Sequence, residues 1–146
     1  MKIEYFKLSE FDARDADGKK IPGTGGQMRA CTIEKCDKLR EAYGKPLVVA
    51  SGIRTPERNK IVGGVKNSSH LLGYAVDWKD IFDDYLIQFL DAAWDVGFRR
   101  FGIMATGIHT DDDPTKTTPA LWDYSTTPRS RWQSAKVWMA GKLKEI

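Results

Sequence analysis

Three segments of the chain repeat apolar side chains at helical spacing. Residues 28–43 alternate apolar and charged side chains in this way, and a glycine follows them. Residues 82–93 carry one apolar stripe, with Asp80 as the expected helix cap and Gly97 as the stop. A last helix is expected from about Ser130. The pattern therefore predicts two long internal helices and a third near the end of the sequence.

Short apolar runs between these helices predict three strands. They cover residues 47–50, 74–78 and 100–104. In the second run, alternation places Ala75 and Asp77 on one face and the larger apolar side chains on the other. A carboxylate is therefore expected on the polar face of an otherwise apolar strand.

The segment TPERNKIVGG predicts one further, short helix. Thr55 is the expected N-cap, Pro56 occupies the first helical position and the paired glycines end the helix. No repeat, low-complexity tract or linker divides the 146 residues, so a single domain, 1–146, is expected. Few connections suit a parallel βαβ unit, so the element order predicts an α+β fold with a small, mainly antiparallel sheet packed with helices.

Composition and charge are those of an ordinary soluble globular protein. Apolar residues make up 41% and charged residues 29%, which excludes disordered and fibrous classes. The net charge of +3 is a mild excess without a dense basic block, so no nucleic-acid partner is expected. No signal peptide or membrane-length apolar run is visible, so we expect synthesis in the cytoplasm and no stable membrane association. Cys31 and Cys36 are expected to be reduced thiols, and the chain to be a monomer.

The chain has only two histidines, and both lie near candidate strands. His70 precedes Asp77 by seven residues, and Gly73 between them permits the turn that would bring the two side chains together. His109 follows the third apolar run and could add a ligand from an adjacent strand. Two imidazoles and one carboxylate around Zn²⁺, with one position left for water, form a catalytic rather than a structural site. On spacing alone, two hydrogen-bonded histidines in the core or at the surface remain the alternative.

A longer motif surrounds the first histidine. The run SGIRTPERNKIVGGVKNSSHLLGYAVDW resembles the core of the M15 family of zinc D-Ala-D-Ala peptidases, in which S-G-x-R-[ST] is followed by S-x-H-x-x-G-x-A-x-D. The stretches FKLSEFDARD and LREAYGKPLVVASG also resemble the start of its small, single-domain, often phage-encoded members. Their third ligand comes from an H-x-D sequence, and HTD stands here at the corresponding place. The similarity covers roughly residues 4 to 111 and implies the Hedgehog/DD-peptidase fold.

Carried over to this sequence, the resemblance implies His70, Asp77 and His109 as ligands of a Zn²⁺ cofactor. It also implies that Arg54 is a catalytic and substrate-binding cation, which grips a carboxylate or polarises the scissile carbonyl. A structural salt bridge is the alternative for Arg54. Ser68 is expected at the substrate site, hydrogen-bonded to the loop backbone rather than reacting, because no histidine remains to activate it.

One position departs from the family pattern. Well-studied members have a glutamate or aspartate three residues before the last histidine as general base, and Thr106 stands there in this sequence. Asp111 is the expected substitute, and orientation of a metal ligand is its alternative role. Asp112 and Asp113 are read as a solvated loop. The aromatic residues Trp122 and Tyr124 either line the cleft or pack in the core.

The expected function is that of a zinc metallopeptidase that hydrolyses amide bonds in peptidoglycan stem peptides. D,D-carboxypeptidase and endopeptidase activity both stay open, and a phage or prophage endolysin is one expected setting. Its site of action would be the periplasm or cell wall after release from the cell. A non-catalytic zinc-containing domain that binds the cell wall or belongs to a virion is the alternative, because Thr106 replaces the usual base.

Overall fold

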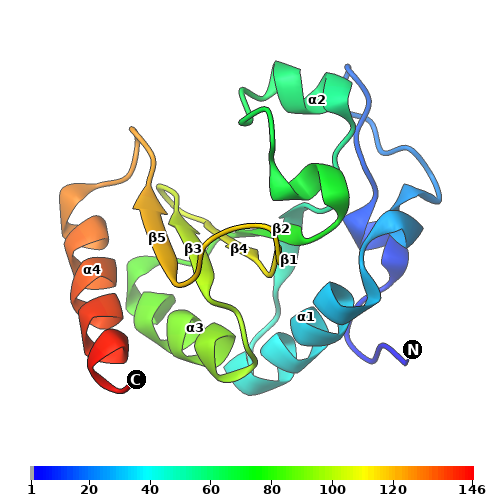
Figure 1. Cartoon of the computed structure of the whole chain (residues 1–146). Coiled ribbons are helices and arrows are strands. Elements are labelled where there is room, and N and C mark those ends of the chain that lie inside the picture. Colours follow the sequence, from blue (N-terminus) through cyan, green and yellow to red (C-terminus); the bar gives the residue numbers. More distant parts are fainter. Residues whose placement is uncertain (1) are drawn as a thin grey trace.

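A five-stranded sheet forms the centre of the protein in the computed structural model, which describes residues 2–146 (Figure 1). The strands are β1 (Val48–Ser51), β2 (Ala75–Lys79), β3 (Arg100–Ile103), β4 (Ile108–Asp111) and β5 (Ala120–Asp123). They follow the order β1-β2-β4-β3-β5 across the sheet. Only the β3–β5 pair is parallel among these described strands. The predicted α+β fold with a mainly antiparallel sheet is therefore confirmed.

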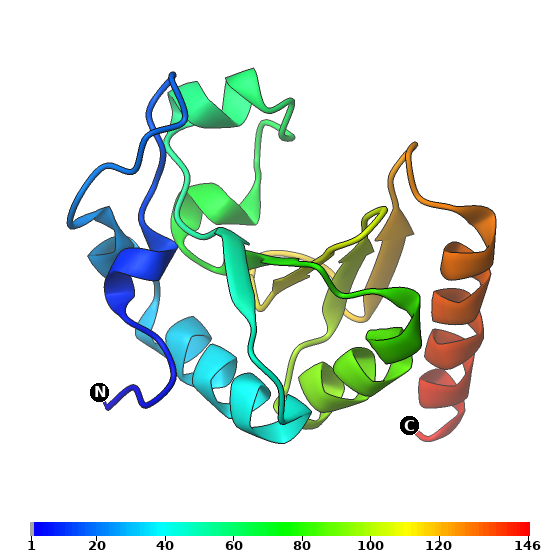
Figure 2. The same cartoon turned by 180° about the vertical axis from the view of Figure 1, so that it is seen from behind.

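The helices lie around this sheet. They are α1 (Ala30–Tyr43), α2 (Pro56–Ile61), α3 (Asp83–Asp95) and α4 (Arg129–Lys144), with 3₁₀-helices at Leu8–Phe11, Thr24–Gln27 and Ser69–Leu72. The first and third α-helices lie side by side beneath the sheet, and the last packs against β5 and α3 (Figures 1 and 2). The short α2 and the 3₁₀-helix Ser69–Leu72 rise on the opposite side of the sheet. No helix within residues 2–146 has the length and apolar character needed to span a bilayer.

Local signals explain the end of α1 and the start of α2. Gly44 ends α1 in the left-handed conformation, with a φ of 75° that suits glycine. The Thr55 hydroxyl accepts a hydrogen bond from the backbone of Arg58 at the start of α2, as predicted. The expected cap of α3 was wrong. Asp80 has a φ of 57° in the link after β2, and the N-cap is Phe82, which makes no side-chain cap bond.

Apolar side chains fill the space between the sheet and the helices beneath it. Trp78 is fully buried, and its indole nitrogen donates to the Thr110 hydroxyl on the neighbouring strand. Phe101 packs edge-on against Trp138 of α4, with ring centroids 5.3 Å apart. The other core side chains that the strands send to this side are also fully buried: Val76, Ile103 and Ile108.

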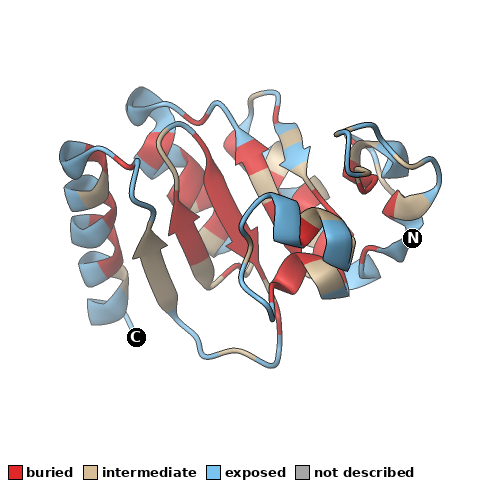
Figure 3. Ribbon diagram, turned by 90° about the horizontal axis from the view of Figure 1, so that it is seen from above, coloured by how far each residue is buried: buried red, intermediate tan, exposed pale blue. Residues whose placement is uncertain are grey.

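The strands β4 and β5 were not predicted as strands. Residues 108–111 do not show the alternation of a usual strand, because three of its four side chains, His109, Thr110 and Asp111, are polar and still buried. Residues 120–123 form an edge strand of intermediate burial, tan in Figure 3, within a stretch that was expected to be irregular. Cys31 and Cys36 are free, in agreement with the expectation of reduced thiols.

Candidate metal centre

Four strands contribute to one line of residues across the sheet. Asp77 on β2 pairs with His109 on β4, and His109 pairs in turn with Gly102 on β3. Gly102 then pairs with Trp122 on β5. Directly paired residues in neighbouring strands send their side chains to the same face. The register therefore brings the carboxylate, the imidazole and the indole to the face opposite the apolar core.

His70 reaches this line from above the sheet. It lies in the 3₁₀-helix Ser69–Leu72, which begins after Ser68 and ends at Gly73 in the left-handed conformation. The Ser68 hydroxyl accepts from the His70 backbone nitrogen, so Ser68 holds the loop backbone, as its sequence context predicted. The His70 Nδ1–H donates to the Gly52 carbonyl at 2.8 Å. This bond leaves Nε2 free to face the site.

Three donor atoms converge at the end of this arrangement. His70 Nε2 lies 3.1 Å and His109 Nδ1 2.9 Å from the same Asp77 oxygen, Oδ1. The ligand atoms of the three residues all lie within 4.8 Å of one another. Two imidazole nitrogens and one carboxylate oxygen are a donor set that suits Zn²⁺ and leaves a fourth position for water or substrate. The structure thus brings together the three ligands expected from the sequence.

The charges of these groups are strongly coupled. Burial alone would raise the pKa of Asp77, but the charges and hydrogen bonds of the two histidines hold it well below its usual value. Burial alone would lower the pKa of His109, but its hydrogen bonds to Asp111 and Asp77 raise it to about 9. Burial lowers the pKa of His70, despite the nearby Asp77 carboxylate. His70 is therefore ready to act as a neutral ligand, whereas His109 must give up a proton first.

Asp111 stands behind the His109 ring. Its Oδ2 accepts from His109 Nε2 at 2.7 Å, and its Oδ1 accepts from Arg100 Nε at 2.8 Å and from the Asp113 backbone at 3.2 Å. The residue is only 1% exposed. A carboxylate whose two oxygens are both engaged is poorly placed to take a proton from water. These contacts favour orientation of His109, the second of the two roles considered for Asp111, over that of general base.

The two following aspartates are not a solvated loop, so that reading of the sequence was wrong. Asp112 binds the Thr32 hydroxyl and the Lys35 ammonium group, both on α1. Asp113 is buried and accepts from the Ser69 hydroxyl at 2.7 Å, next to His70. Each of these carboxylates therefore ties the end of β4 to a different element, and Asp113 links the segments that carry the two histidines.

Arg54 lies beside the Asp77 carboxylate. Its Nη2 is 3.4 Å from Asp77 Oδ2 and 3.1 Å from the Ser51 hydroxyl, and its Nη1 donates to Asn59. The guanidinium is thus held by three side chains and also lines the pocket above the donor atoms. Both roles expected for Arg54, a structural ion pair and a cation near the substrate, fit this position. Ser51 and Asn59 had no sequence signal beyond their places in the motif.

A pocket of 980 Å³ opens above the converging donor atoms. Its lining includes the following residues: Arg54, Ser68, His70, Asp77, His109 and Asp111. Thr106 is exposed, is absent from the lining, and accepts a backbone bond from Ile81. The two carboxylates among the lining residues are Asp77 and Asp111. The pocket therefore has cations, imidazoles and a wide opening. Its two carboxylates are both hydrogen-bonded, and Thr106, which replaces the usual general base, lies outside the lining.

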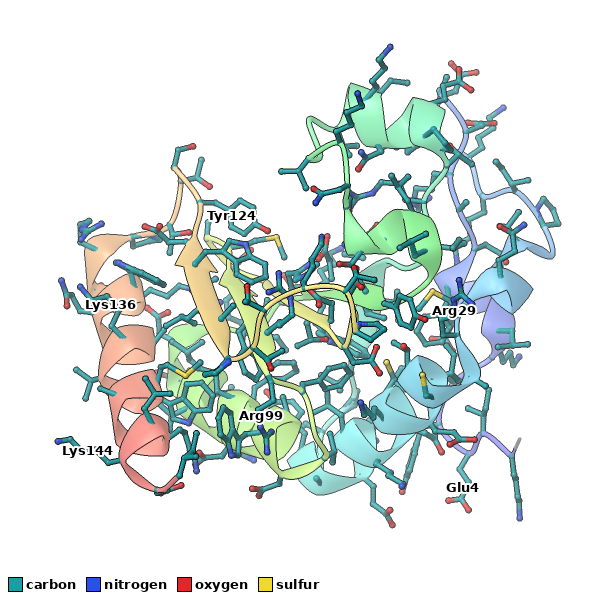
Figure 4. The ribbon with its side chains drawn as sticks, in the orientation of Figure 1. Glu4, Arg29, Arg99, Tyr124, Lys136 and Lys144 are labelled. Atoms are coloured by element: carbon teal, nitrogen blue, oxygen red, sulfur yellow. The ribbon has the colours of Figure 1, made fainter. Side chains whose placement is uncertain are left out.

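Two aromatic residues also line this pocket: Trp122 on β5 and Tyr124 directly after it. The Trp122 ring lies 5.3 Å from the His109 ring, and its Nε1–H donates to the Tyr124 hydroxyl at 3.0 Å. Figure 4 shows Tyr124 above the upper end of β5, where the chain leaves the sheet. Burial raises the pKa of Tyr124 above its usual value. Of the two alternatives for this pair, lining of the cleft fits the structure.

Comparison with known proteins agrees with this geometry. The family model for peptidase M15 matches residues 4–111. The zinc D-Ala-D-Ala carboxypeptidase of Streptomyces albus G is 34% identical to this chain over 74 residues. These residues are 50% of this chain and 29% of that protein, so the match spans less than a third of the relative's length.

Proposed function

Because the chain belongs to the peptidase M15 family, we propose that it is a zinc peptidase that hydrolyses amide bonds in peptidoglycan stem peptides. The observation that carries the proposal is the convergence of His70 Nε2, Asp77 Oδ1 and His109 Nδ1 at the base of an open pocket. The name of the Streptomyces relative, which specifies zinc and D-Ala-D-Ala, supports both the metal and the substrate class.

The three donor residues would hold zinc with one position left open. When bound, the metal supplies Lewis-acid polarisation of the substrate carbonyl and activation of water. Asp111 would keep the His109 ring in the orientation that directs Nδ1 toward the metal. The Gly52 carbonyl does the same for His70 through its Nδ1–H.

The remaining polar groups of the pocket would bind the peptide. Arg54 presents a fixed cation beside Asp77, where it can bind a substrate carboxylate or the carbonyl oxygen as negative charge develops on it. Ser68 lines the same pocket and fixes the backbone before His70. The open pocket suits a peptide chain rather than a small molecule, which favours neither carboxypeptidase nor endopeptidase action by itself. Action at the cell wall as an endolysin stays a prediction.

Digestion of purified sacculi by the zinc-loaded protein tests this function. Mass spectrometry should detect either released D-Ala, for a carboxypeptidase, or new amino termini, for an endopeptidase. His70→Ala should lose both zinc and product formation, because a ligand atom is removed. Thr106→Ala is the matched control and should keep both, because Thr106 is exposed and outside the pocket lining. Wall binding by the wild-type protein without any product would instead support the non-catalytic alternative.

A further inference from the structure

We propose that the Tyr124 hydroxyl donates a hydrogen bond to the carbonyl oxygen of the scissile amide, and that Gly102 and Trp122 position it for this purpose. The inference deepens the proposed function and rests on it. Trp122 on β5 and Tyr124 in the turn after it lie beyond the segment 4–111 that the family model matches, whereas Gly102 on β3 lies within it.

The lack of a side chain at Gly102 lets the indole reach the site. Gly102 stands between His109 and Trp122 in the line across the sheet. A Cβ atom at Gly102 would lie 2.6 Å from Trp122 Nε1, so any larger residue would displace the ring. The indole therefore lies over the glycine and approaches His109, with ring centroids 5.3 Å apart. The position of the ring nitrogen is fixed by this packing.

The hydrogen bond from Trp122 determines where the hydroxyl proton of Tyr124 can go. An indole nitrogen can only donate, so in the 3.0 Å contact the Tyr124 oxygen must be the acceptor. The hydroxyl keeps one proton of its own for a second partner. Among residues 2–146, no protein acceptor takes that proton. Because Tyr124 lines the same pocket as His70 and Asp77, a bound substrate is the partner that the geometry offers.

The sheet order places this donor opposite Arg54. Arg54 follows β1 and Tyr124 follows β5, and these are the two edge strands of the sheet (Figure 1). A peptide lying over the central strands would meet a cation on one side and a neutral hydroxyl on the other. A donor aimed at an oxygen that gains negative charge in the transition state strengthens as the reaction proceeds. The hydroxyl would thus act on turnover more than on ground-state binding.

Tyr124→Phe removes only the hydroxyl and tests the proposal. With zinc-loaded protein and a defined stem peptide, kcat should fall about 100-fold, while KM and zinc content stay at wild-type values. Tyr85→Phe is the matched control: Tyr85 is 43% exposed against 40% for Tyr124, lies on α3, and is outside the pocket lining. It should leave kcat unchanged. A kcat of Tyr124→Phe equal to that of the wild type would overturn the proposal.

Binding gives a readout that does not depend on turnover. A phosphinate analogue of the stem peptide mimics the tetrahedral transition state, and calorimetry should show its affinity reduced by a similar factor in Tyr124→Phe. The affinity for the product peptide should not change. Equal loss for the analogue and the product would assign Tyr124 to general substrate binding and contradict the proposal.

A double-mutant cycle tests the positioning by Trp122. Trp122→Phe keeps an aromatic ring but loses the Nε1–H that orients the hydroxyl, so kcat should fall by less than in Tyr124→Phe. In the Trp122→Phe background, Tyr124→Phe should cost less than it does alone. Full additivity would remove Trp122 from its positioning role. If the wild-type protein releases no product from any stem peptide, the proposed function itself fails, which differs from an active wild type matched by an active Tyr124→Phe.

Discussion

The two faces of the central sheet are built from the same strands but have opposite chemistry. One face carries Asp77, His109 and Trp122, and the other carries Val76, Trp78 and Phe101. Adjacent residues in the chain therefore belong to different faces, as the period of two in a strand requires. Viewed from above in Figure 3, most residues of β3 and β4 are buried, whichever face they belong to. The metal-facing side is thus largely buried although it is polar, and it opens to solvent at the pocket above the donor atoms.

This difference separates stability from function at the level of single residues. Burial of apolar surface beneath the sheet stabilises the fold. Burial of charged groups above it costs desolvation energy, and hydrogen bonds offset that cost only in part. Among residues 2–146, no buried side-chain nitrogen or oxygen lacks a hydrogen-bond partner. The polar face is therefore held by complete bonding rather than by packing, and substitutions on the two faces should have different consequences.

The largest effect is expected from a cavity on the apolar face. Phe101→Ala removes a fully buried ring that packs against Trp138 and Trp94, so the free energy of unfolding should fall by about 3–5 kcal/mol. Phe82→Ala, the same change at a residue that is 53% exposed, is the control and should change it by less than about 0.5 kcal/mol. Urea denaturation of zinc-free protein measures both. Equal losses for the two variants would contradict the division between the faces.

A smaller effect is expected on the polar face, and on zinc rather than on the fold. In Asp111→Asn, one of the two partners His109 and Arg100 must face an amide donor, because the oxygens of Asp111 accept from both. Zinc affinity should fall about 10- to 100-fold, measured by competition with a chelator. Asp112→Asn is the control, since Asp112 contacts α1 and not a histidine. Unchanged zinc affinity with reduced kcat would instead restore Asp111 as the general base.

The sequence predicted which residues within a single strand share a face, but not how neighbouring strands are paired. The alternation in residues 74–78 correctly separated Asp77 from Val76 and Trp78, and the side-chain types of the motif identified the three candidate ligands. The line from His109 through Gly102 to Trp122 could not be predicted. It depends on the register between β4, β3 and β5, which is set by contacts distant in sequence and not by the composition of any strand.

The same reason explains two wrong expectations. The run of three aspartates is polar in sequence, and only the tertiary structure supplies the partners Thr32, Lys35 and Ser69 that bind Asp112 and Asp113. Asp80 carries a good capping side chain, but the turn after β2 requires a positive φ at that residue, which aspartate tolerates better than most residues. Local preference identified the element in each case, and tertiary context decided the role of the residue.

The smallest effect for a single step is a dependence of zinc affinity on pH, about tenfold for each pH unit, and it again belongs to the polar face alone. Hydrogen bonds to Asp111 and Asp77 raise the pKa of His109 to about 9, so zinc must displace a proton from Nδ1 at neutral pH. Affinity should rise about tenfold per pH unit from about pH 6.5 and level off near pH 9. In zinc-free protein the sign is opposite. A pKa raised above the unfolded value stabilises the fold below about pH 6.5, and this contribution is lost as the pH rises through about 9.

Calorimetry in buffers of different ionisation enthalpy should detect the release of about one proton per zinc at pH 7.5. Asp111→Asn should move the plateau to lower pH because it removes one source of the raised pKa, whereas Phe101→Ala should leave the profile unchanged. A zinc affinity that is flat between pH 6.5 and 9 would show that His109 is already neutral and that its two carboxylate partners do not hold the proton.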